Sequence, residues 1–255
     1  STMGSIKDQN RIILIILLGM MGVGMLSCKK ASERSCWKSY GDEAELEYPI
    51  SEVDSITLLK NIKYRIYQDS LNKVVVKGGE NVVGLVEVVQ EGGHLKVSNE
   101  NSCNFLRDSD KKIEVEIHYP EYNRIYCEPS DSVVFEDTIT GDSLFFEMRN
   151  GGGSGILNVN VNFIRINVSF GTGDYRLSGQ ADHAELKVQN NGFADCRDFL
   201  ADFVFVHSVS TADLYVNLQG SSVLMDIQGT GNVYYIGDYN AISNTSSGSG
   251  ELIKL

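Results

Sequence analysis

Acidic and amide side chains recur at nearly constant spacing in the second half of this 255-residue chain. The positions are 21, 18 and 19 residues apart, at Asp174, Asp195, Asp213 and Asn232. A ladder of carboxylates at such spacing could bind Ca²⁺ or supply the acid and base of a glycan-active enzyme. Turn chemistry is the simpler explanation, because Asp and Asn bond to nearby backbone at tight turns. Asn at the fourth position favours turns, since an amide would weaken a charged ligand set.

The residues around these positions predict corners that join repeated units. Gly171-Thr172-Gly173 returns as Gly229-Thr230-Gly231, and looser restarts follow Asn190 and Ser210. We expect positive φ at these corners, where a Cβ would be costly. The predicted structural turn positions are Gly171, Gly173, Asp174, Gly192, Asp213, Gly229, Gly231 and Asn232.

The text between the corners alternates aliphatic and polar residues, as in 157–161, 185–188, 214–218 and 225–227. Alternation places the aliphatic side chains of each unit on one inner face. Units that repeat about every 20 residues would stack these faces into a continuous core. The sequence therefore predicts an all-β single domain, a right-handed β-helix or β-solenoid.

The first half also reads as strands. Residues 62–67 and 113–119 alternate, and Gly92-Gly93 predicts a hairpin turn between two apolar runs. The one weak helix candidate, Phe199 to Val206, is rich in β-branched and aromatic residues and so favours a strand.

The N-terminus carries a secretion pattern. Lys7 and Arg11 precede an apolar run at 12–18, and the segment ends in Leu26-Ser27-Cys28. It resembles a bacterial lipoprotein signal, in which the cysteine is lipidated and becomes the mature N-terminus. We predict a signal peptide at 1–27, lipid attachment at Cys28, a polar tether at 28–45 and the β-solenoid domain at 46–255.

Composition narrows the partners. The formal net charge is −12 and no basic cluster is present, which argues against nucleic-acid binding. No second apolar stretch is long enough to cross a bilayer, so membrane attachment would rest on the lipid.

The remaining cysteines and histidines indicate no metal site, and no cofactor is predicted. Three disulfide pairings, or buried free thiols, stay open for Cys36, Cys103, Cys127 and Cys196. The histidines are scattered, and His118 is expected to be an exposed strand residue. The tyrosines considered for stacking on a glycan are Tyr215, Tyr234, Tyr235 and Tyr239.

Taken in order, several phrases resemble the head GIN domain family of bacterial envelope proteins over roughly 53–255. They are 112–120 (KIEVEIHYP), 171–174 (GTGD), 226–237 (DIQGTGNVYYIG) and 247–251 (SGSGE). The resemblance implies a β-helical lipoprotein of the Bacteroidetes envelope. The family name conjectures an adhesin, and the family supplies no catalytic residues.

Three function classes follow. The first is a non-enzymatic, lipid-anchored envelope protein that presents a solenoid face to carbohydrate or protein. The second is a structural lipoprotein facing the periplasm, and the third is a glycan-active β-helix enzyme. We expect an outer-membrane location; Lys29-Lys30 after the cysteine, in place of the acidic patch of surface-exported lipoproteins, favours the periplasmic side.

If Cys28 carries the anchoring lipid, Cys28→Ala should move the protein from the membrane fraction to the soluble fraction. The measurement is cell fractionation with immunoblotting of both forms. Retention of the variant in membranes would refute lipid anchoring.

Overall fold

The computed structural model describes residues 40–59, 61–99 and 112–255. The predicted signal peptide, Cys28, Cys36 and Cys103 lie outside these ranges, as does most of the predicted tether. Within them, no helix is long and apolar enough to cross a membrane.

The described residues form eighteen strands and one 3₁₀ turn, η3 (Val83–Leu85), and contain no α-helix. The strands are β1 (Glu43–Pro49), β2 (Ser55–Leu58), β3 (Lys63–Gln68), β4 (Lys73–Gly79), β5 (Val86–Glu91), β6 (His94–Asn99), β7 (Glu114–Tyr119), β8 (Arg124–Cys127), β9 (Ser132–Phe135), β10 (Ile139–Arg149), β11 (Ser154–Ser169), β12 (Asp174–Asn190), β13 (Phe193–Ser210), β14 (Leu214–Asn217), β15 (Ser222–Ile227), β16 (Val233–Ile236), β17 (Ala241–Asn244) and β18 (Leu252–Lys254). The all-β solenoid prediction is confirmed, and the weak helix candidate lies inside β13.

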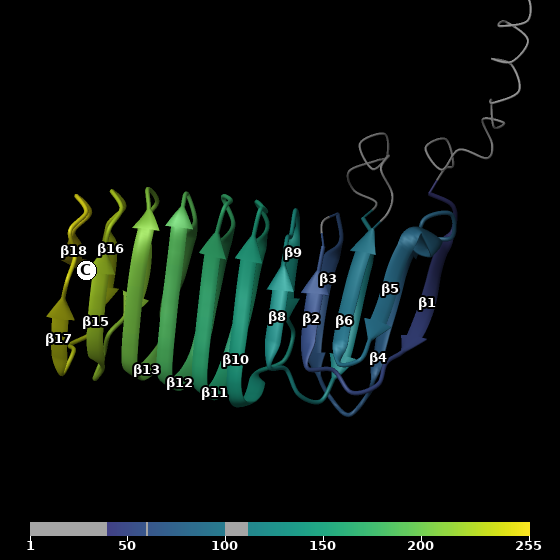
Figure 1. Ribbon diagram of the computed structural model, residues 1–255, viewed down its shortest axis with the longest axis horizontal. Coiled ribbons are helices and arrows are strands. Elements are labelled where there is room, and N and C mark those ends of the chain that lie inside the picture. Colours follow the sequence, from purple (N-terminus) through teal and green to yellow (C-terminus); the bar gives the residue numbers. More distant parts are fainter. Residues whose placement is uncertain (1–39, 60, 100–111) are drawn as a thin grey trace, which may run out of the picture. The chain divides into compact units, whose positions relative to one another are not determined.

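From β8 onward the chain winds in coils that pair in parallel with the coils before and after them (Figure 1). Each of the long strands β11, β12 and β13 bends and forms two sides of its coil. In β11 the buried positions run in one alternating phase to Val161 and resume in the other phase from Ile164. The bend therefore keeps the aliphatic side chains of both sides pointing inward.

The register corrects one predicted repeat position. Asp174 lies opposite Phe193, 19 residues on, whereas Asp195 lies opposite Arg176 and Tyr215. A β-bulge causes the difference: the register between β12 and β13 shifts between Arg176 and Ser178, which changes the spacing from 19 to 20 residues. Counting restarts along the sequence cannot locate such a bulge.

The corner glycines are required for a different reason from the one predicted. Positive φ occurs at Asn150, Phe170 and Asn190, not at the predicted glycines. A Cβ on Gly171, Gly229 or Gly231 would instead lie closer than 3.0 Å to a backbone carbonyl of the preceding coil. These glycines therefore permit close coil stacking, and their expected positive φ is wrong.

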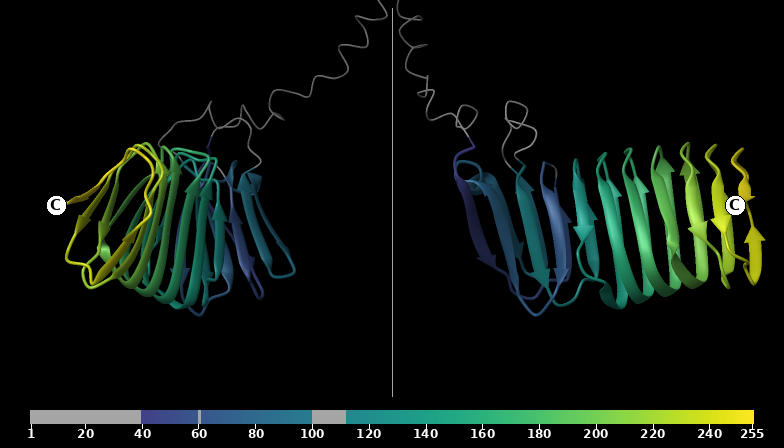
Figure 2. Two further views of the ribbon diagram at one scale, coloured as in Figure 1. Left: turned by 60° about the vertical axis from the view of Figure 1, so that its left-hand side comes forward. Right: turned by 180° about the vertical axis from the view of Figure 1, so that it is seen from behind.

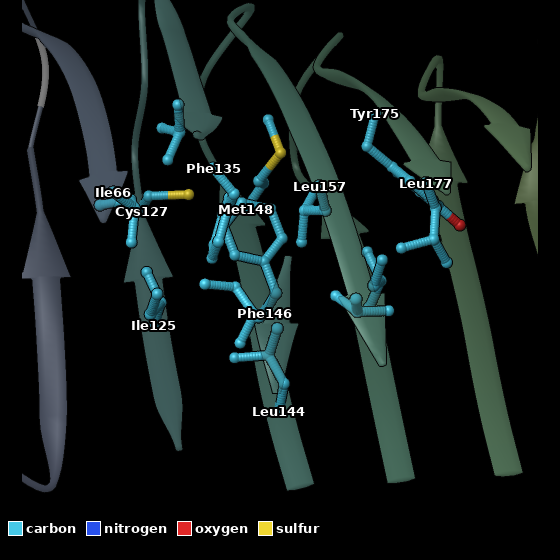
Figure 3. Close-up of a cluster of buried hydrophobic side chains, with 14 of the residues drawn as sticks. Ile66, Ile125, Cys127, Phe135, Leu144, Phe146, Met148, Leu157, Tyr175 and Leu177 are labelled. Atoms are coloured by element: carbon cyan, nitrogen blue, oxygen red, sulfur yellow. The ribbon is translucent and has the colours of Figure 1, made fainter. Parts of the chain in front are cut away.

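A continuous hydrophobic core runs through the coils. Figure 3 shows Leu144, Phe146 and Met148 of β10 pointing inward between Cys127 of the preceding coil and Leu157 of the next. Full burial of each large aliphatic or aromatic side chain contributes about 1.5–3 kcal/mol.

Cys127 and Cys196 are buried free thiols, one of the two alternatives that the sequence left open for them. Burial raises the pKa of both thiols, so both remain protonated and unreactive at neutral pH. The pairing of Cys36 and Cys103 stays a question for residues outside the described ranges.

The first part of the domain departs from parallel winding. β1 pairs antiparallel with β4, β4 pairs antiparallel with β7, and β5 and β6 form a hairpin. Gly92, with φ +58°, turns that hairpin and confirms the prediction for Gly92-Gly93. β1 begins at Glu43, so the predicted tether boundary at residue 45 lies inside a strand; polar composition hid it, since β1 is mostly exposed.

A methyl group at Gly231 would meet the carbonyl of Ala212, whereas one at Gly173 would lie 3.1 Å from the flexible end of Met148. Gly231→Ala should therefore lower the free energy of unfolding by about 1–3 kcal/mol, and Gly173→Ala by less than about 1 kcal/mol. Chemical denaturation of both variants checks this difference. Equal losses would contradict the stacking explanation.

Candidate functional site

The predicted corner residues connect one coil to the next. Asp174 accepts a hydrogen bond from the Ser154 hydroxyl at 2.6 Å. Asp213 accepts one from the backbone N–H of Asn232, and Asn232 accepts one from the backbone N–H of Glu251, both at 2.9 Å. Asp and Asn are equivalent in this role because only the accepting oxygen is used. Within the described residues, no three His, Cys, Asp or Glu side chains are grouped to hold a metal ion.

Asp195 belongs to another part of the surface. Arg197 donates to it through Nε at 2.9 Å and Nη2 at 2.6 Å, and these bonds hold its pKa below the usual range. The carboxylate ladder Asp174–Asp195–Asp213 considered from the sequence is therefore wrong, because the register does not align its three members.

His118 is half-buried, which corrects the expected exposure. Its side chain is 14% exposed, its Nδ1 lies 2.7 Å from Asp69 Oδ2, and its ring stacks on Tyr67 at 4.6 Å. The cause is register: β3 pairs with β7 and places Tyr67 directly beside His118.

The other histidines do not assemble a catalytic triad. His94 contacts the Ser55 hydroxyl at 2.9 Å, while His207 contacts Asp226 at 2.8 Å. Across the described ranges, the serine-bound and the carboxylate-bound histidines are thus different residues, so these contacts form no Ser–His–Asp arrangement.

One outer face gathers aromatic and cationic side chains from successive coils. In register across it lie Arg124 of β8, Phe145 of β10, Arg165 of β11 and Glu185 of β12. We name this region the cation–aromatic face and define it as Arg124, Phe145, Glu147, Phe163, Arg165, Asn167, His183, Glu185, Lys187, Phe203 and Phe205.

Rings on this face form a ladder along the coils. The centroid distances are 5.5 Å from Phe145 to Phe163, 5.2 Å from Phe163 to His183 and 4.6 Å from His183 to Phe203. All four rings are partly exposed. Because neighbouring rings cover each other's faces, the ladder presents mainly ring edges, which carry the positive end of the ring quadrupole.

Charge on the face is concentrated around Glu185. Arg165 donates to it through Nε and Nη2 at 2.7 and 2.9 Å, and Lys187 Nζ lies 3.0 Å away. Hydrogen bonding from Arg165 first, then from Lys187, lowers the pKa of Glu185 to about 2 despite partial desolvation. Glu185 therefore stays ionised throughout the physiological range.

A hollow of about 330 Å³ opens on this face. Its lining includes Arg124, Phe145 and Arg165 on one side and Tyr126, Glu147, Asn167 and Lys187 on the other. The hollow crosses strands β8, β10, β11 and β12, which lie next to one another in Figure 2. The arrangement can hold a ligand across several coils without any moving segment.

The tyrosines predicted for glycan stacking lie elsewhere. Tyr215 and Tyr234 stack on each other at 5.1 Å and 14°, and Tyr235 packs against the core. Mutual stacking leaves less ring face for a sugar. The ladder positions 145, 163, 183 and 203 follow the same period of about 20, so extending the repeat search upstream of residue 171 to aromatic residues would have found them.

Comparison with known proteins gives a family and a fold. The family model described as "Putative auto-transporter adhesin, head GIN domain" matches residues 52–238. No match is found among curated proteins.

Solved structures similar to this chain come from gut-type bacteria of two genera. A "putative adhesin" from Bacteroides fragilis is 22% identical, with a TM-score of 0.74, covering 84% of this chain and 97% of its own. A "Putative lipid binding protein" from Parabacteroides distasonis is 20% identical, with a TM-score of 0.64 and coverage of 85% and 98%. At these identities the likeness establishes the fold alone.

Since the folded pKa of Glu185 is lowered, its stabilising effect is complete above about pH 4.5 and is lost as pH falls toward 2. Glu185→Gln should reduce unfolding free energy at pH 7 by about 1–2 kcal/mol, a value discounted for the exposure of Arg165. The difference from wild type should shrink by pH 2.5. Denaturation at both pH values tests this, and a pH-independent difference would contradict it.

Proposed function

Because this chain belongs to the head GIN domain family, we propose that it is a non-enzymatic binding module of the cell envelope. Its cation–aromatic face contacts a carbohydrate or protein partner, as the adhesin description of the family suggests. The proposal rests on one observation: the ladder of partly exposed rings from Phe145 to Phe203 on an outward sheet face.

The position of this face supports binding. Outward positions of a sheet next to water are ordinarily polar, and contiguous exposed apolar groups are typical of interaction sites. Both neighbours of β11 and β12 are paired strands, which fixes the side chains in place before a ligand arrives. A preorganised surface avoids part of the ordering cost of association.

The charges on the face support binding over catalysis. Glycoside hydrolysis needs a carboxyl group with a raised pKa as general acid. Glu185 has the opposite shift, since Arg165 and Lys187 hold it ionised. A glycan-active enzyme is therefore the weaker alternative for this face.

Attachment and location belong to the same proposal. Lipid at Cys28 anchors the protein at the outer membrane, and the polar segment after it gives the domain reach. A structural lipoprotein facing the periplasm is the alternative, and it differs in needing no ligand on the ladder.

Phe163→Ser combined with Phe203→Ser should remove at least about 90% of binding to a glycan array and to a panel of immobilised extracellular proteins, since it breaks the ladder at two rungs. Ile156→Ser is the matched control: Ile156 is a 41% exposed apolar residue on the other side of the β11 bend. The melting temperature of each variant shows whether the fold persists. Equal binding by wild type and the double variant would overturn this assignment of the face.

A further inference from the structure

The cation–aromatic face contains one arginine whose charge is not compensated. Among the described residues four arginines stack on aromatic rings: Arg124 on Phe145, Arg149 on Phe170, Arg165 on Phe145 and Phe163, and Arg197 on Tyr215. Three of them bind a carboxylate: Arg149 binds Glu147 at 2.8 Å, Arg165 binds Glu185 at 2.7 Å, and Arg197 binds Asp195 at 2.6 Å. Arg124 has no carboxylate within 4.0 Å in the described ranges.

Stacking prepares the Arg124 guanidinium to bind an anion. Its Cζ lies 5.4 Å from the centre of the Phe145 ring, and the ring also contacts Arg165, at 5.5 Å, from the next coil. A guanidinium that uses its flat face on a ring keeps its in-plane N–H donors free. Those donors match the two oxygens of a carboxylate or sulfate.

The surroundings add positive charge. Around the hollow stand four cations, Arg124, Arg149, Arg165 and Lys187, against two carboxylates, Glu147 and Glu185. Four minus two leaves a formal charge of +2 on one patch of a chain whose total is −12. Charge complementarity therefore favours an anionic ligand at this place.

The polar lining favours a sugar as the carrier of that anion. Asn167 donates to Glu147 at 3.0 Å within the hollow, and amide and carboxylate groups of this kind bind sugar hydroxyls. An extended peptide normally gains affinity by pairing with a free strand edge. None is offered here, because β10 and β11 are paired on both sides along the hollow.

We propose that this hollow is a subsite for an acidic glycan, with the uronate carboxylate or sulfate of one sugar bound by Arg124. This deepens the proposed function and depends on it, since the subsite lies on the same face as the ring ladder. Arg165 stays engaged with Glu185 and supports the Phe145 ring from its other side.

The test uses the full chain and an array of uronate- and sulfate-bearing oligosaccharides, with methyl-esterified uronates as uncharged counterparts. Wild type should bind acidic members at least tenfold more tightly than their esters, and binding should weaken with salt. Arg124→Gln should lose about tenfold or more in affinity, and Arg124→Lys should fall in between, because lysine keeps the charge without the fork.

Arg197→Gln is the matched control, since Arg197 also stacks on a ring, Tyr215 at 5.0 Å, but lies outside the hollow. It should bind as wild type does. Ester binding equal to acid binding, unchanged affinity of Arg124→Gln, no acidic glycan bound at all, or tighter binding of a short poly-glutamate peptide would each overturn the subsite.

The two proposals fail in different ways. If Phe163→Ser with Phe203→Ser abolishes binding while Arg124→Gln leaves it unchanged, the binding face stands and the acidic subsite falls. If the double phenylalanine variant retains all binding, the function assigned to the face falls with it.

Discussion

The distance between coils is the constraint on which the rest of this structure depends. Parallel pairing brings each backbone within hydrogen-bonding distance of the coil before it, and the corners must close at the same spacing. At Gly171, Gly229 and Gly231 the preceding carbonyl occupies the place of a side chain. The corner carboxylates and amides serve the same stacking, since Asp213 and Asn232 each accept a backbone N–H from the following coil.

The same spacing creates the chemistry of the outer surface. Residues in register lie one above another, so a ring at one position contacts the ring at the next, and an arginine contacts the glutamate beside it. Phe163 on His183 and Arg165 on Glu185 are two products of a single register between β11 and β12. A solenoid therefore builds extended ladders from one residue per coil, and its outer face becomes a rigid, linear surface suited to a long ligand.

Inside the coils, packing removes reactive groups from use. Cys127 and Cys196 are enclosed by aliphatic neighbours, and burial keeps their thiols protonated. The groups left to contact a partner are on the outside, where paired charges hold most side chains in place. Arg124 differs because its position has the ring but not the acid.

The sequence by itself determined the class of fold, the alternation of inward and outward residues, the hairpin at Gly92-Gly93 and the period of about 20, since these follow from local patterns of side-chain type. Only the tertiary structure decided the alignment of columns, because one bulge between Arg176 and Ser178 shifts every count that crosses it. That shift separates Asp195 from Asp174. It also decided the burial of His118, which depends on a strand far away in sequence. The cation–aromatic face belongs to the second group: its members are ordinary strand residues, and their contact arises from the stacking of coils.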